Sequence, residues 1–296
     1  MENILKHELS PVPLFLAKTN RQLLSAKNKA DLQDILTEKT TAKILTNLPK
    51  SQSPTCLLID APGLIQVIGK PENASTFADL ADVFSGIVKG KSGKGYSRDD
   101  ILFGRCLETS IKDGTRFDWV GNMRPIRKVI YSRHVKLPQT LQQFITHSKN
   151  KAELASFLSN ELMMSAKDLS EGHELIITGG FDDTNQAWSS CQSDVSQVKS
   201  SHKEADTRFI LHVKEAKEVG YNRVVIQCRD TDVLVLAVGH RKHQPSQIWR
   251  SCGTSEKPKY IPVHAINYPP LVMDNVITYH SVTGCDTTNQ FSGKAE

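Results

Sequence analysis

The chain has 296 residues, of which 39% are hydrophobic and 23% are charged, and its formal net charge is +5. Its hydrophobic content is too high and its net charge too low for an intrinsically disordered chain. No apolar run approaches the roughly 20 residues of a membrane span, so a membrane partner is not expected. Six cysteines without a C-x-x-C pair predict a reducing, intracellular compartment, without a choice between nucleus and cytoplasm.

The first 50 residues are predicted to form a helical accessory segment. Apolar residues recur at helical spacing over 30–36 and 42–45. The stretch 48–54, rich in Pro and Ser, is typical of a linker. Residues 51–296 are therefore expected to form the main domain, which is long enough to bury one large core.

Beyond the linker, short apolar runs alternate with helical patterns. A loop is expected at 90–100, and residues 112–140 are basic and irregular. Alternation of strands with helices of this length predicts an α/β fold with a mainly parallel central sheet. The predicted strands are 56–60, 101–103, 173–180, 223–228, 247–249 and 260–263. The predicted helices are 75–89, 150–166, 202–219 and 269–282.

Acidic residues lie near the ends of several predicted elements. One ends the first strand, two follow the strand 223–228, two open the helix 202–219, and one follows a Gly-Cys turn near the end of the chain. Ligands of open α/β sheets bind at the carboxyl ends of the strands, so we expect these acids to meet at one edge. They are Asp60, Glu204, Asp206, Asp230, Asp232 and Asp286.

Such a cluster would repel itself, because two like charges 4 Å apart cost about 4 kcal/mol at an effective dielectric constant of 20. Oxygen ligands without paired His or Cys favour Mg²⁺ or Mn²⁺ over zinc, and two such ions support phosphodiester hydrolysis. Individual acids also have structural interpretations. Ser201 and Glu204 fit a capping box, and Asp230 and Asp232 fit a turn and a helix N-cap.

The segment 86–136 carries twelve Lys and Arg residues against five Asp and Glu residues. A phosphate backbone is a suitable partner for such a segment, and an ordinary solvated surface is the alternative interpretation. We expect nucleic acid as the partner, DNA in preference to RNA. The candidate phosphate-binding residues are Lys89, Lys91, Lys94, Arg98, Arg124, Arg127, Lys128 and Arg133.

Five segments together resemble the PIN-like nucleases of the flap endonuclease/XPG superfamily, and more closely a group of animal PIN-like proteins. The resemblance implies a three-layer PIN-like fold with a mainly parallel central sheet flanked by helices. It also implies that all six acids are catalytic and hold two Mg²⁺ or Mn²⁺ ions. The segments are LLIDAPGLIQ (57–66), FADLADVF (77–84), HKEADTRFILH (202–212), CRDTDVLVLAV (228–238) and TGCDTTNQFSGK (283–294).

The sequence departs from the superfamily pattern in three places. Gly104 stands where an acid usually ends the second strand, and Asp99 and Asp100 precede that apolar run instead of following it. Lys203 replaces a second acid that related proteins carry. The chain stops soon after Asp286, so the domain is expected to be truncated, without the helical elements with which flap endonucleases hold DNA.

Two main functions follow from this comparison. One is a metal-dependent nuclease, impaired by Gly104. The alternative is a catalytically inactive PIN-like module that binds nucleic acid or a protein. A phosphatase-like enzyme with Asp230 as nucleophile is a third option, although Leu234 departs from that motif.

Overall fold

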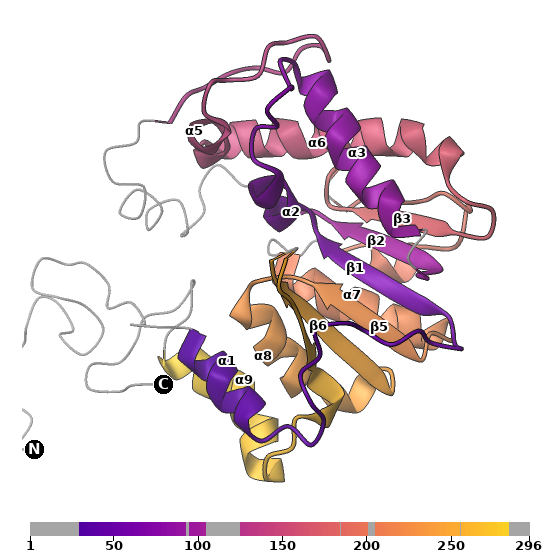
Figure 1. Ribbon diagram of the computed structural model, residues 1–296, viewed down its shortest axis with the longest axis vertical. Helices are drawn as coiled ribbons and strands as arrows, with labels where there is room; N and C mark the ends of the chain where they lie inside the picture. Colours follow the sequence, from indigo (N-terminus) through magenta and orange to yellow (C-terminus); the bar gives the residue numbers. More distant parts are fainter. Residues whose placement is uncertain are drawn as a thin grey trace, which may run out of the picture.

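The computed structural model describes residues 30–92, 95–104, 125–183, 185–200, 205–254 and 256–283. Within these ranges the protein has an α/β fold with three layers, a central sheet between two sets of helices (Figure 1). The strand order of the sheet is β4-β3-β2-β1-β5-β6-β7. The strands are β1 (Thr55–Asp60), β2 (Arg98–Leu102), β3 (Glu174–Thr178), β4 (Ala187–Ser189), β5 (Arg223–Gln227), β6 (Gln247–Gly253) and β7 (Pro258–Pro262).

The five inner strands are parallel, and β4 and β7 pair antiparallel at the two edges. The register places Asp60 opposite Leu102 of β2 and Ile59 opposite Gln227 of β5, so these three strands end at the same edge. From β1 the chain runs outward to β2 and β3, then returns to β5 on the other side of β1. The boundary between β1 and β5 is therefore the point where the strand order reverses, the usual ligand position in such sheets.

Helices cover both faces of the sheet. One face carries α2 (Ala61–Ile68), α3 (Phe77–Ser92), α5 (Leu141–Thr146) and α6 (Ser148–Ser165), and the other carries α1 (Ala30–Glu38), α7 (Ala205–Glu218), α8 (Thr231–Gly239) and α9 (Pro270–Thr283) (Figure 1). Alternate residues of β1 point to opposite faces of the sheet. Leu57 and Ile59 lie in the first core, against α2, α3, α5 and α6, and Cys56 and Leu58 lie in the second core, against α1, α7, α8 and α9. Short 3₁₀ turns are η1 (Ala166–Asp168), η2 (Ser196–Val198), η3 (Arg241–His243) and η4 (Val263–Ala265).

The apolar runs predicted six of the seven described strands near their observed positions and missed β4, and two local predictions need correction. Residues 42–45 are not helical, because Leu45 forms an isolated bridge with Tyr260. The segment 90–100 is not all loop, since α3 extends to Ser92 and β2 already begins at Arg98. The Ala-Pro-Gly sequence after β1 opens α2, with the proline in the first turn where its missing N–H costs nothing.

The described part of the N-terminal segment joins the main core. Leu32 and Leu36 of α1 are buried in the second core together with residues of α7, α8 and α9. Thr40 forms a further isolated bridge with Ile266. Helix α1 is therefore packed as part of the same domain. Of the helices that the structure describes, none is long and apolar enough to cross a membrane.

Candidate functional site

Three aspartates meet at the carboxyl edge of the sheet. Asp206 lies in the first turn of α7, Asp230 is the N-cap of α8, and Asp232 lies in the first turn of α8. Each offers a carboxylate oxygen, and these oxygens all lie within 4.8 Å of one another. All three side chains are partly exposed. The N-terminal ends of two helices face this charge and reduce the mutual repulsion of the carboxylates.

The loop after β5 fixes two of these carboxylates. The backbone of Asp230 is extended, and its side chain accepts a hydrogen bond from the N–H of Asp232 at 3.0 Å. This bond caps the first turn of α8, which is the usual role of Asp at a helix N-cap. The N–H of Asp230 donates to Sγ of Cys228 at 3.4 Å. The apolar run that forms β5 thus leads directly into a tight turn that places two acids together.

Helix α9 contributes a histidine to the same place. His280 is buried, and its Nε2 lies 2.9 Å from Oδ1 of Asp232. Helices α8 and α9 approach closely, since a Cβ added at Gly239 would lie 2.5 Å from Cδ1 of Ile277. The sequence analysis missed His280, because one histidine in a predicted helix carries no signal of its partner 48 residues away.

Asp60 lies beside this cluster at the point where the strand order reverses. Its Oδ2 lies 3.6 Å from Sγ of Cys228, which links it to the loop that carries Asp230. Burial raises the pKa of Asp60, and the nearby charge of Asp230 raises it further. Hydrogen bonds from the Gly63 N–H and the Cys228 thiol act in the opposite direction and lower this pKa. A Cβ at Gly63 would lie 2.5 Å from Oδ2 of Asp60, so a glycine is needed for this carboxylate to fold back over the start of α2.

The remaining predicted acids, Glu204 and Asp286, lie outside the described residues. Gly104, however, is placed. A Cβ at this position would lie 3.6 Å from Cβ of Ala205, in ordinary van der Waals contact with the residue before Asp206. The position where the superfamily pattern expects an acid is therefore next to the aspartate cluster.

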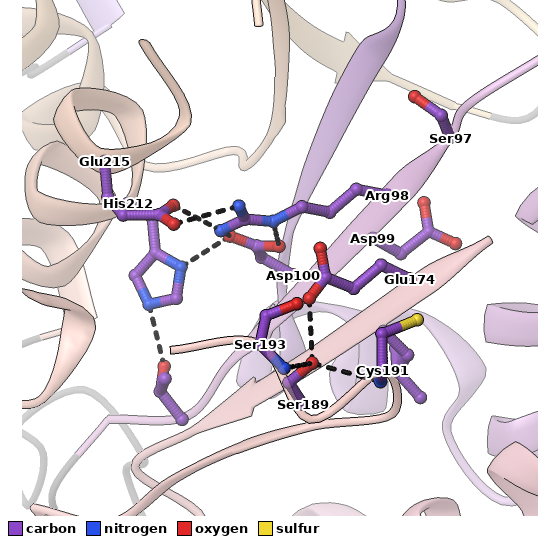
Figure 2. A network of polar contacts seen from close by, with 12 residues as sticks. Ser97, Arg98, Asp99, Asp100, Glu174, Ser189, Cys191, Ser193, His212 and Glu215 are labelled. Atoms are coloured by element: carbon purple, nitrogen blue, oxygen red, sulfur yellow. Dashed lines mark hydrogen bonds and ion pairs between the residues drawn. The ribbon is translucent and has the colours of Figure 1, made fainter. Parts of the chain in front are cut away.

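Arg98 belongs to a buried polar network between β2 and α7 (Figure 2). Arg98 is 1% exposed and donates to both oxygens of Asp100, at 2.6 and 2.8 Å. It also donates to both oxygens of Glu215 on α7, at 3.2 and 2.6 Å. Buried between two carboxylates, Arg98 cannot bind a phosphate at the surface, and the prediction was wrong.

The same network attaches α7 to β2. Nδ1 of His212 lies 2.6 Å from Oδ2 of Asp100, and its Nε2 lies 3.1 Å from Oγ1 of Thr178 (Figure 2). On the opposite face of β2, Nε2 of His173 lies 3.0 Å from Oδ2 of Asp99. Asp99 and Asp100 are thus buried strand residues with partners of their own. Because α7 carries Asp206 at its start, this attachment also helps to place the acidic cluster.

Most other predicted phosphate-binding residues that the structure describes have acidic or polar partners. Arg127 pairs with Glu153, and Arg133 donates to Glu161 at 2.9 Å, both on α6. Nζ of Lys91 donates to the side chain of Gln227 at 2.9 Å. Lys89 lies in the last turn of α3, Lys128 lies in the segment before α5, and Lys94 and Arg124 fall outside the described residues.

No model of a known protein family matches the chain, and no curated protein matches it significantly.

Proposed function

We propose that the protein is a divalent-metal-dependent nuclease with a PIN-like domain. The observation that carries this proposal is the meeting of three carboxylates, from Asp206, Asp230 and Asp232, within 4.8 Å at the edge where the strand order reverses. Asp230 and Asp232 are neighbours at the start of α8, and the fold brings Asp206 of α7 to them from a separate helix.

The chemistry of this donor set fits Mg²⁺ or Mn²⁺, because every ligand atom is a carboxylate oxygen. Asp206, Asp230 and Asp232 would hold the metal, with Asp60 beside them as a further ligand. The bound ions would supply an activated water and stabilise the oxygen that leaves the phosphodiester.

The protein's own groups prepare the site. His280 orients the carboxylate of Asp232, and the N–H of Asp232 holds the carboxylate of Asp230. Partners of this kind around metal ligands fix their orientation and raise metal affinity. Basic residues such as Lys89 and Lys128 are the proposed contacts to the phosphates of nucleic acid, DNA in preference to RNA.

The test combines metal binding with cleavage. The purified full chain is titrated with Mn²⁺ by calorimetry, and flap, single-stranded and duplex DNA are incubated with it in Mg²⁺ or Mn²⁺. We expect wild-type protein to bind Mn²⁺ and cut at least one substrate, and Asp230→Asn to lose both properties. Asp82→Asn is the matched control, because Asp82 is an exposed carboxylate on α3, outside the cluster. The proposal fails if wild type gives no heat, or if Asp230→Asn binds Mn²⁺ as wild type does.

The second candidate is a metal-binding PIN-like module without nuclease activity. Gly104 favours it, because this position lies against the start of α7 and offers no carboxylate there. Mn²⁺ binding that disappears in Asp230→Asn, together with no cleavage of any of the three substrates, would support this function instead.

A further inference from the structure

Arg250 holds the loop that carries two of the three clustered aspartates. It lies in β6 and is 1% exposed. Its Nε donates to the carbonyl oxygen of Cys228 at 3.2 Å. Its Nη2 donates to the carbonyl oxygens of Arg229 at 2.6 Å and Asp230 at 3.1 Å. One guanidinium therefore binds three consecutive carbonyl groups of the β5–α8 loop.

These carbonyls lie just beyond the end of the sheet ladder, since the last paired residue of β5 is Gln227, opposite Ser251. Without a ladder, the loop needs other donors to keep a single conformation. A guanidinium suits this task because its donors form a rigid planar fork, whereas a lysine offers one flexible ammonium. Asp230 and Asp232 follow directly, so the fork fixes the starting point of both side chains.

Helix α1 completes the arrangement from the N-terminal segment. Nη1 of Arg250 donates to Oε1 of Gln33, and the two residues are 217 positions apart. Helix α1 is fixed in turn by the burial of Leu32 and Leu36 and by the hydroxyl of Tyr268, which donates to the carbonyl of Ile35. A continuous set of contacts thus runs from the core of α1, through Gln33 and Arg250, to the aspartate loop.

We propose that Arg250, held by Gln33 of helix α1, is the positioning residue of the loop that carries Asp230 and Asp232. Loss of the Gln33 contact should loosen this loop and lower the metal affinity of the site. The effect on metal affinity rests on the proposed function, whereas the positioning of the loop does not need a metal.

The experiment compares Arg250→Lys and Gln33→Ala with wild type, and it uses Asp34→Asn as the control, since Asp34 is the exposed neighbour of Gln33 on α1. Hydrogen exchange of the metal-free full chain is followed by mass spectrometry. We expect amides of 228–232 to exchange about tenfold faster in Arg250→Lys, as loss of charge-assisted hydrogen bonds implies, and faster to a smaller extent in Gln33→Ala. Peptides of β1 and β2 should exchange as in wild type.

Mn²⁺ titration provides the second measurement. Loss of a positioning contact should weaken Mn²⁺ binding about tenfold or more in Arg250→Lys, with a smaller loss in Gln33→Ala and none in Asp34→Asn. If Arg250→Lys does not fold, Gln33→Ala still gives both measurements. The inference is overturned if Gln33→Ala exchanges like Asp34→Asn, or if faster exchange spreads evenly over the sheet. Wild type that binds no Mn²⁺ would refute the proposed function, and the exchange data would still decide the positioning.

Discussion

Replacement of Glu215 by glutamine tests whether the buried network between β2 and α7 supports the fold. Glu215 accepts two hydrogen bonds from Arg98, which is 1% exposed. Removing one partner of a buried ion pair costs about 3–5 kcal/mol, because it leaves a charge without compensation. Asp100 still faces Arg98 in the variant, and glutamine keeps one oxygen acceptor. We therefore expect the free energy of unfolding to fall by about 2–3 kcal/mol.

Glu218→Gln is the matched control on the same helix. Its carboxylate lies 3.7 Å from Nζ of Lys214, and the side chains are 41% and 61% exposed. An exposed pair of this kind contributes about 0.5 kcal/mol or less. Both substitutions remove one negative charge from α7. The difference between their free energies of unfolding therefore measures the effect of the buried position of Glu215, apart from the change in overall charge.

Urea unfolding followed by circular dichroism measures the two effects. With a slope near 3 kcal/mol per molar, a loss of 2–3 kcal/mol lowers the midpoint by about 0.7–1 M, against less than about 0.2 M for the control. The slope should be the same in all three proteins. A Glu215→Gln midpoint equal to that of Glu218→Gln would refute the reasoning, since the pair with Arg98 would then add nothing to the fold.

Two further predictions concern the edge of the sheet. Burial raises the pKa of Asp60 above its ordinary value of 3.8, so the folded protein binds this proton more tightly than the unfolded chain and the ionised group destabilises the fold at neutral pH. In urea unfolding without metal, Asp60→Asn should be more stable than wild type at pH 7, by a margin that shrinks as the pH falls toward 3.8; a less stable variant at pH 7 would contradict this. Gly104→Asp should tighten Mn²⁺ binding by calorimetry, because a Cβ fits beside Ala205 at 3.6 Å. Gly86→Asp, on the exposed side of α3, should leave it unchanged, and equal affinities in the two variants would argue against position 104 as part of the site.

The structure brings together three of the four predicted acids that it describes. Apolar runs identify β1 and β5, and parallel strands that end in acids must deliver those acids to one edge. Asp60, Asp230 and Asp232 lie at one edge for that reason, and the first turn of α7 adds Asp206 to Asp230 and Asp232. These positions follow from local sequence patterns and a general rule of sheet topology. The PIN-like identity stays a prediction.

The buried charges could not be predicted in the same way. The sequence Arg98-Asp99-Asp100 has the composition of an exposed loop, yet these residues form most of a fully buried strand. What permits this is a set of partners far away in the chain, with Glu215 117 positions and His212 112 positions distant. The pattern of apolar residues in the sequence cannot reveal such partners, because each of them is a single polar residue within a helix.

Two of the buried arginines, Arg98 and Arg250, explain how the candidate site is held in place. Arg98 and Arg250 lie on the face of the sheet that packs α7 and α8. Arg98 attaches α7, which presents Asp206, and Arg250 attaches the loop that presents Asp230 and Asp232. The distance between Asp206 and the pair Asp230 and Asp232 therefore depends on the buried side chains of Arg98 and Arg250 as well as on the acids themselves. Burying a charge is costly unless its partners are held in place, so each arginine also requires its helix or loop to stay where it is, and the geometry of the aspartate cluster follows from that requirement.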